Sequence, residues 1–481
     1  MTEKGKIISA SWYSILSELV AKVVGPIGFL ILTRLLSPND FGIVAIATTI
    51  LNFIYLLSDL GVGNVIIQER GTPQFLSKIN NVGFWFSGLL GLILSLFIIL
   101  FSVSLAKFFK EPKSSLVISV MAIQIVFYSL STVQNALQKR ALNFKFLFYL
   151  RLITVVVPLI ISIPLAFNGF GYWAMVWGQV LGSFLTTSVL WYNSKWKPSF
   201  TFDYSILKKI LSKSIWSTVE QISLWVPIVL DTYLISNYLS SRELGMYSTS
   251  KTLFTSAVML SLGAILPVLF STYSAINDDE FYYRKIVLLS QKIVFGIAAF
   301  MGTGIFIFSE LIEKIIFTRN WSGISEIFGI IFLIMGLAYF NSVIVEGLRA
   351  KGYFRVVAIN TAICILVETP LLFLSIKYGI IVYVIVRSML LYLLYPGVFV
   401  YSKKFIKISF LDCIKNSKYA ILSFLGILSS YYFIIKLNLD FVSTNIIMFI
   451  IYGLVCLTYL FFEKETFKML LLQVKSFRKS S

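Results

Sequence analysis

The stretch VGFWFSGLLGLILSLFIILFSVSLA, residues 82–106, decides the fold of this chain. It carries no charged side chain and is long enough to cross a hydrocarbon core of about 30 Å as one helix. Comparable apolar runs follow one another through all 481 residues. Backbone polar groups inside a bilayer must be paired within the protein, and these runs are too long for barrel strands of about ten residues. The sequence therefore predicts an all-α integral membrane protein.

The composition excludes several classes of function. Hydrophobic residues make up 58% of the chain and charged residues 13%, which is about half the charged fraction of a typical soluble domain. The net charge of +19 sits in short loops between apolar runs, so we expect no nucleic-acid partner. The chain has no histidine, the commonest catalytic base and transition-metal ligand, and its three cysteines are isolated. We therefore expect no metal, no disulfide framework and no organic cofactor.

Run lengths, loop charges and Pro/Gly breaks predict about fourteen transmembrane spans. They cover residues 7–33, 42–68, 79–106, 115–137, 146–167, 171–192, 213–238, 246–273, 285–308, 322–348, 355–376, 380–401, 415–435 and 442–462. The first run is too long for a signal-peptide core and lacks a small-residue cleavage site, so we expect it to be retained. The connections are too short to hold an extramembrane catalytic domain.

The loop charges predict the orientation. Of the 41 Lys and Arg residues, 29 are assigned to the set of loops that includes both termini, and nine to the alternate set. Only Lys22, Lys251 and Arg387 are assigned to the interior of spans. Because cytoplasmic loops are enriched in Lys and Arg, both termini are predicted to be cytoplasmic.

An internal repeat predicts the domain organisation. A shift of 203 residues places LSPNDFG, residues 36–42, over LSSRELG, residues 239–245, and a shift of 210 places Phe144-Lys145 over Phe354-Arg355. Each copy holds six spans, an even number, so the copies share one orientation about an axis along the membrane normal. We expect six-helix lobes at residues 1–200 and 201–402. Two extra transmembrane helices and a tail follow at residues 403–481.

Ionisable residues inside spans are costly and commonly face a protein-lined or watery interior. Glu18 and Lys22 lie four residues apart on one helix face, where they form either a structural pair or part of a cavity. Glu220 and Gln221 match Ser17 and Glu18 in the repeat. The symmetry therefore predicts acidic and amide groups from both copies near one central axis.

Three further ionisable residues allow two interpretations each. Asp231 either lines the interior or pairs with Lys251 across its hairpin, and Asp59 either lines the interior or caps a break in the second span. Arg387 either contacts an anionic substrate, since its planar fork matches phosphate, or pairs with Glu368.

Several segments resemble one family of transporters. They are RLLSPNDFG (34–42), SDLGVGNVIIQ (58–68), QKRALNFK (138–145), GFGYWA (169–174) and LGMYS (244–248). These segments resemble bacterial polysaccharide exporters of the Wzx type, in the multidrug/oligosaccharidyl-lipid/polysaccharide superfamily. The chain looks most like the colanic-acid and teichuronic-acid exporter branch. The resemblance covers nearly the whole chain and is strongest in residues 1–290.

The resemblance implies a multi-pass protein of the bacterial cytoplasmic (inner) membrane with two six-helix lobes around a cationic cavity. It implies flipping of an undecaprenyl-pyrophosphate-linked oligosaccharide by alternating access, for export of a surface polysaccharide. Implied partners are membrane lipids and the glycan polymerase and glycosyltransferases of the pathway. This chain departs from the pattern because few cations are assigned to its spans.

On this interpretation Lys22 and Arg387 contact the pyrophosphate. The predicted substrate-binding set also contains Lys251, Glu18, Glu220, Gln221 and Trp216, and the candidates for carrying a coupling H⁺ or Na⁺ are Glu18, Glu220 and Asp231. The first alternative is a cation-coupled drug exporter of the same superfamily, which would suit these carboxylates. A membrane glycan polymerase is the second, but it would need a larger outer loop. We therefore expect a transporter without catalytic residues rather than an enzyme.

Overall fold

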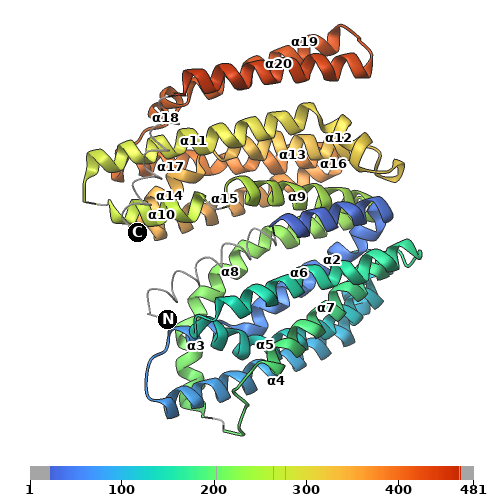
Figure 1. Cartoon of the computed structure of the whole chain (residues 1–481), viewed down its shortest axis with the longest axis vertical. Helices are drawn as coiled ribbons and strands as arrows, with labels where there is room; N and C mark the ends of the chain where they lie inside the picture. Colours follow the sequence, from blue (N-terminus) through green and yellow to red (C-terminus); the bar gives the residue numbers. More distant parts are fainter. Residues whose placement is uncertain (1–21, 202, 264, 277, 465, 467–481) are drawn as a thin grey trace. The chain divides into compact units, whose positions relative to one another are not determined.

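A computed structural model of the chain describes residues 22–201, 203–263, 265–276, 278–464 and 466. Every regular element in these residues is a helix (Figure 1). An initial helix is described over residues 22–35. It is followed by α2 (Pro38–Asp59), α3 (Val62–Gln68), α4 (Pro73–Phe108), α5 (Ser114–Arg140), α6 (Phe144–Phe167), α7 (Tyr172–Tyr192) and α8 (Tyr204–Tyr238).

The second copy and the C-terminal segment continue the series. The α-helices are α9 (Ser241–Ser261), α10 (Ile265–Ala275), α11 (Glu280–Ile307), α12 (Ser309–Ile316), α13 (Ile324–Ala338), α14 (Ser342–Ala350), α15 (Phe354–Ser375), α16 (Ile380–Met389), α17 (Leu394–Phe405), α18 (Phe410–Asn416), α19 (Lys418–Lys436) and α20 (Phe441–Phe462). Short 3-10 turns lie at Arg319–Trp321, Ile376–Tyr378 and Leu390–Leu393.

The chain is a multi-pass helical membrane protein, as predicted. Within the described residues, ten helical segments are long and apolar enough to cross a bilayer. Of the other four predicted spans, residues 7–21 of the span 7–33 lie outside the described residues and the rest of it falls on the initial helix. The remaining three fall on α7, α8 and the α9–α10 pair. The count of fourteen is consistent with these helices and stays a prediction.

The helix boundaries confirm the parallel repeat. Helices α2 and α9 begin 203 residues apart, at Pro38 and Ser241, and α3 and α10 begin at the same spacing. Helices α6 and α15 begin 210 residues apart, at Phe144 and Phe354. The repeat therefore extends to the positions where the helices start.

The second predicted span is interrupted after Asp59, the position at which the sequence left a break open. Helix α2 ends at Asp59, and Leu60 and Gly61 take positive φ angles of 40° and 75° before α3 begins. A glycine adopts this left-handed conformation at little cost. The carboxylate of Asp59 accepts a hydrogen bond from the backbone N–H of Gly63 at 3.2 Å, so Asp59 does cap the break. The predicted continuous spans 42–68 and 246–273 are thus each two helices, because the chain also breaks between α9 and α10.

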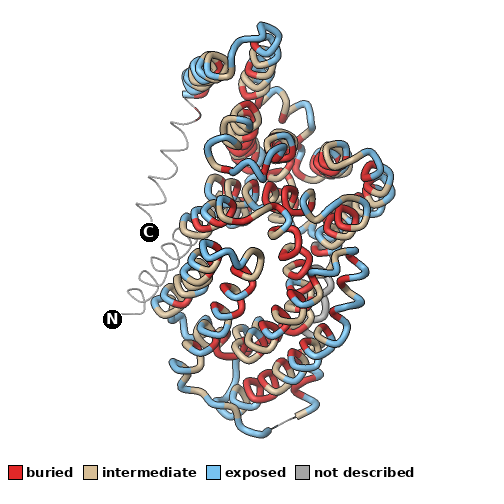
Figure 2. Tube along the Cα trace, turned by 90° about the vertical axis from the view of Figure 1, so that its right-hand side faces the viewer, coloured by how far each residue is buried: buried red, intermediate tan, exposed pale blue. Residues whose placement is uncertain are grey.

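Contacts divide the chain into two compact units, residues 1–249 and 250–481. In the first unit α5 packs against α2, α3, α4 and α7, and in the second α11 packs against α13, α14 and α19. Figure 2 shows along the chain which residues are buried and which are exposed. About 61% of the apolar window is buried in α2, α11 and the segment 324–350, but only 11% in α6 and α20. The former helices form unit interiors, and the latter present apolar surface suited to lipid. The predicted lobe boundary at residue 200 follows the repeat and stays a prediction.

The two extra C-terminal helices, α19 and α20, lie side by side and are fastened to α11 by polar contacts (Figure 1). Lys292 Nζ lies 2.9 Å from Glu463 Oε2, and the Tyr452 hydroxyl donates to the Phe300 carbonyl at 2.7 Å. The charge count assigned Lys292 to a loop, but the residue lies within α11. Lys292 is therefore a basic residue inside the predicted span 285–308, and its ion-pair partner is Glu463.

Candidate functional site

A polar cavity of about 590 Å³ lies in the first unit. Its walls come from α3, α5, α6 and α7 together with the last residue of α2. Its polar lining includes Asp59, Asn64, Ser131, Asn135, Lys139 and Arg151. The break after α2 contributes to this lining, because it places Asp59 and the first turns of α3 at the same wall.

Arg151 is the strongest functional feature of the cavity. It lies about two turns inside α6, a helix apolar enough to span a bilayer, and its side chain is exposed to the cavity. It forms no ion pair with any residue in the described part of the chain. An arginine in a transmembrane helix costs several kcal/mol unless it meets water, a partner or a ligand, which marks it as a candidate binding residue.

The other polar groups complement this charge. Lys139, in the last turn of α5, is exposed and is attracted electrostatically to Asp59. The side-chain oxygen of Asn135 is buried and has no hydrogen-bond partner among the described residues. Guanidinium and ammonium groups suit phosphate oxygens, whereas carboxylate and amide oxygens suit hydroxyl donors. The cavity can therefore hold a ligand that combines an anion with hydroxyl groups.

In the second copy, the cation that corresponds to Lys139 forms an ion pair. The shift of 210 residues places Lys139 over Arg349, whose Nη1 lies 2.8 Å from Glu346 Oε1. In the same unit Arg387 Nη1 lies 3.4 Å from Glu368 Oε2, and both side chains are 8% exposed. The pairing of Arg387 with Glu368 is one of the two alternatives that the sequence left open. The two copies therefore differ: within the described residues the cavity cations form no ion pair, whereas these arginines of the second unit do.

Four of the predicted site residues cannot be placed, and Lys22 lies away from the polar cavity. Glu18 lies outside the described residues, and the side chains of Trp216, Glu220 and Gln221 on α8 are outside the description as well. Lys22, the first described residue of the initial helix, is half-buried and does not line the cavity. The roles predicted for these residues stay predictions.

Two further predicted residues lie on α8 and α9. Asp231 is buried and accepts a hydrogen bond from the Tyr247 hydroxyl at 2.8 Å. Lys251 is half-buried on α9, and neither residue lines the polar cavity. Their predicted roles, coupling ion and substrate contact, also stay predictions.

Sequence reasoning missed Arg151 and Lys139. Both were assigned to the basic loop that follows the fourth span, although the predicted fifth span already began at residue 146. The available signal was position, because Arg151 is followed without interruption by the apolar run of α6. Counting a charge by its nearest loop hides an arginine that lies within the first turns of a span.

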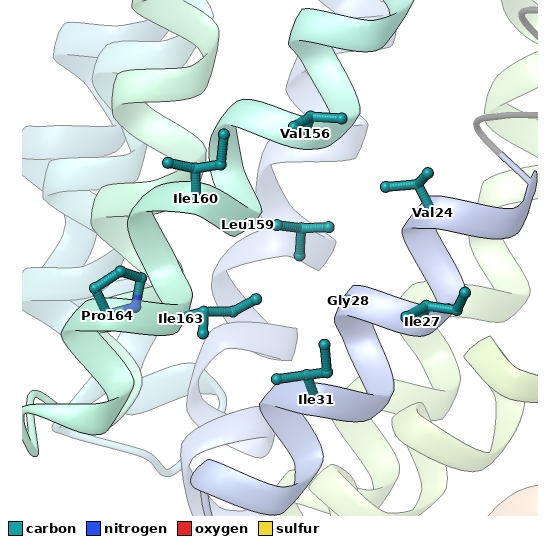
Figure 3. Close-up of a pocket in the computed structure, with 9 residues that line it drawn as sticks. All are labelled: Val24, Ile27, Gly28, Ile31, Val156, Leu159, Ile160, Ile163 and Pro164. Atoms are coloured by element: carbon teal, nitrogen blue, oxygen red, sulfur yellow. The ribbon is translucent and has the colours of Figure 1, made fainter.

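An apolar groove of about 400 Å³ lies on another face of α6 (Figure 3). Val24, Ile27 and Ile31 on the initial helix face Leu159 and Ile163 on α6 across it. Every lining residue is apolar, and apolar cavities favour hydrocarbon over water. Helix α6 therefore separates the polar cavity from a surface suited to lipid chains.

The fold is shared with solved transporter structures. The lipid II flippase MurJ in an inward closed conformation superposes with a TM-score of 0.75 at 16% identity, covering 94% of this chain and 99% of that chain. An inward-facing multidrug resistance MATE transporter of the MOP superfamily gives 0.69 at 14% identity, covering 82% and 98%. By architecture the chain is thus a two-copy helical membrane protein with the fold of this superfamily.

The family follows from the sequence match. The model of the family described as "Polysaccharide biosynthesis protein" matches residues 31–326, more than half of the chain, and the chain belongs to this family. The resemblance noted in the sequence is thereby confirmed.

Among curated proteins, the succinoglycan biosynthesis transport protein ExoT of Rhizobium meliloti (strain 1021) is 24% identical over 325 residues, 67% of this chain and 65% of that protein. The lipopolysaccharide biosynthesis protein WzxC of Escherichia coli (strain K12) is 20% identical over 333 residues, 67% and 66%. An uncharacterized membrane protein in the cps region of Klebsiella pneumoniae is 25% identical over 287 residues, 58% of each chain. The matches span less than two thirds of each relative's length.

Proposed function

We propose that this chain flips a lipid-linked oligosaccharide across the bacterial cytoplasmic membrane for export of a surface polysaccharide. The observation that carries the proposal is the pair of cations, Arg151 and Lys139, in a polar cavity inside a membrane-embedded unit. Membership of the polysaccharide biosynthesis family and relatives named for succinoglycan transport and lipopolysaccharide biosynthesis support the same cargo class.

The cavity chemistry matches an undecaprenyl-pyrophosphate-linked sugar. Arg151 and Lys139 would hold pyrophosphate oxygens, and each hydrogen bond to a charged group contributes about 1.5–3 kcal/mol. Asp59 would accept hydrogen bonds from sugar hydroxyls, and Asn64 would accept and donate them. Lys22 remains a proposed second contact, and Arg387 would have to leave Glu368 before it could join them.

The transport cycle is proposed to alternate between cytoplasm-open and outward-open states without covalent chemistry. Both termini would face the cytoplasm, as the loop charges predict. Asp231, Glu18 or Glu220 would carry a coupling H⁺ or Na⁺. The partners would be membrane lipids and the glycan polymerase and glycosyltransferases that use and make the cargo. No catalytic residue is assigned.

The competing proposal is a cation-coupled drug exporter, because the MATE transporter shares the fold. The charges of the cavity argue against it. Two cations and one carboxylate line the cavity in the described residues, and this excess of positive charge would disfavour cationic drugs. A drug-resistance assay of an overexpressing strain would measure any such activity directly.

A deletion strain tests the proposed function. Loss of the gene should leave the lipid-linked unit made but confined to the inner leaflet, where an impermeant sugar-oxidising or lectin probe cannot reach it in intact spheroplasts. Restoring the full chain should return the surface glycan, and restoring the Arg151→Gln chain should return much less of it. Normal glycan export by the deletion strain, in a background without a second exporter, would refute the proposal.

A further inference from the structure

A pair of tyrosines lies at the inner end of the polar cavity. Tyr128 lines the cavity from the middle of α5 and is 41% exposed. Its ring lies against the ring of Tyr55 on α2, with the ring centroids 4.8 Å apart and the planes inclined by 38°. Because Tyr55 covers one face of the ring while Tyr128 stays exposed, the ring can offer its other face to a ligand.

Tyr128 lies deeper in the cavity than the two cations. Along α5 it comes eleven residues before Lys139, a distance of about 16 Å at 1.5 Å per residue. Lys139 lies in the last turn of α5, and Arg151 lies about two turns inside α6, which begins at the same end of the cavity. The predicted topology places this end at the cytoplasmic face. A ligand that fills the cavity therefore meets the cations first and the tyrosine ring last.

The polar groups that line the cavity with Tyr128 include several neutral ones. Ser131 and Asn135 follow it at spacings of three and four residues, so all three side chains share one face of α5. The hydroxyl oxygens of Thr154 on α6 and Thr186 on α7 lie 3.5 Å apart and belong to the same lining. An aromatic face beside hydroxyl and amide groups suits a polyhydroxylated ring, whose C–H face lies on the aromatic ring while its hydroxyls bond the polar groups.

The second copy of the repeat has no counterpart of the tyrosine pair. The shift of 210 residues places Ala338 over Tyr128, and the shift of 203 residues places Val258 over Tyr55. A pair required by the shared helix packing would be expected in both copies. Its presence in the first copy alone, beside the cations that form no ion pair among the described residues, favours a role in ligand binding.

We propose that Tyr128 stacks on a neutral pyranose ring of the cargo, while the pyrophosphate lies toward Lys139 and Arg151. This inference rests on the proposed function and deepens it, because it makes Tyr128 a residue that selects the sugar. Asp59 lies near enough to Tyr128 to interact with it electrostatically, and its carboxylate disfavours an acidic sugar at this position. The cargo therefore enters the cavity with its sugars first and its pyrophosphate last.

Glycan export by the restored deletion strain tests the stacking contact with the cell's own cargo. Tyr128→Leu keeps apolar volume but removes the aromatic face, whereas Tyr128→Phe keeps the face and removes the hydroxyl. At limiting cargo Tyr128→Leu should export about two- to tenfold less glycan, the range expected for one aromatic contact, and Tyr128→Phe should export normally. The matched control is Tyr149→Leu on α6, which changes a similarly exposed tyrosine outside the cavity lining and should export normally.

Calorimetry of the purified full-length chain separates a sugar contact from a packing role. The probes are citronellyl pyrophosphate alone and the same molecule carrying glucose, galactose or N-acetylglucosamine. The parent chain should bind at least one sugar-bearing probe more tightly than the bare pyrophosphate, and Tyr128→Leu should lose this preference while keeping its affinity for the bare probe. Equal binding of all four probes by the parent, or an equal loss for all of them in Tyr128→Leu, would overturn the sugar contact.

A second non-aromatic variant covers failure of Tyr128→Leu to reach the membrane. Tyr128→Met has a flexible apolar side chain that can refill the contact with Tyr55, and it should show the same loss of export. Normal export by a non-aromatic variant present at parental amounts, or an equal loss in Tyr128→Phe, would overturn the stacking role. If deletion stops export and Tyr128→Leu restores it fully, the stacking role falls and flipping stands. Normal export by the deletion strain would instead refute the proposed function itself.

Discussion

The guanidinium of Arg387 and the carboxylate of Glu368 form a buried ion pair between α16 and α15, at 3.4 Å. Removing one member of a buried pair leaves an uncompensated charge and costs about 3–5 kcal/mol. We therefore expect Arg387→Ala to lower the thermal stability of the detergent-purified chain, measured by fluorescence-detected unfolding. The double variant Arg387→Ala with Glu368→Ala should recover much of the loss. A single variant as stable as the parent, with impaired export, would instead favour a substrate contact.

The next prediction concerns Arg151. Arg151→Gln should reduce glycan export at least about tenfold at limiting cargo, because a lost charge-assisted contact of 1.5–3 kcal/mol corresponds to that change in affinity. Protein amount should stay normal, since Arg151 has no ion-pair partner among the described residues. Lys145→Gln in the first turn of the same helix, outside the cavity lining, is the matched control and should export normally. Equal export by both variants would remove Arg151 from the site.

The carboxylate of Asp59 has two roles, because it caps the helix break and adds a negative charge to the cavity. Two substitutions can separate these roles. Asp59→Asn keeps an oxygen that accepts from Gly63 N but removes the negative charge, so the helix break should survive and the cavity should become more positive. We expect this variant to bind inorganic pyrophosphate more tightly in calorimetry of the purified chain. Asp59→Ala removes the acceptor too and should lower stability by about 1 kcal/mol. Weaker pyrophosphate binding by Asp59→Asn would contradict the anion assignment.

The groove between the initial helix and α6 gives a packing prediction. A β-carbon on Gly28 would lie 2.1 Å from Leu159 Cδ1, so Gly28→Ala overpacks the contact and should cost about 1–3 kcal/mol. Because the obstacle is the end of a flexible side chain, the double variant Gly28→Ala with Leu159→Ala should relieve the strain. Thermal unfolding of both variants measures the difference, and additive losses would show that the two residues do not meet.

The sequence predicted the architecture well because architecture follows from long apolar runs and from a repeat. The matching starts of α2 and α9 were readable as LSPNDFG over LSSRELG, where capping residues recur at one spacing. Asp59 beside Gly61 and Gly63 also indicated the break of the second span. These signals are local, so no knowledge of distant contacts was needed.

The candidate site was less accessible to sequence reasoning because it depends on which charges are paired in space. For Arg387 the sequence left a substrate contact and a pair with Glu368 open, and Arg387 lies against Glu368, whereas Arg151 was assigned to a loop and lies in a cavity. Residues 19 positions apart on two helices meet only if both helices turn the right faces toward each other. That rotation is set by packing, and the sequence pattern does not specify it.

The unequal charges of the two copies have a consequence for engineering. Lys139 forms no ion pair in the described part of the first copy, whereas its repeat counterpart Arg349 forms an ion pair with Glu346. From this divergence we expect cargo preference to depend on the first copy. Chimaeras that exchange only the first copy with a relative should therefore inherit that relative's glycan, whereas the reciprocal exchange should preserve the original export product.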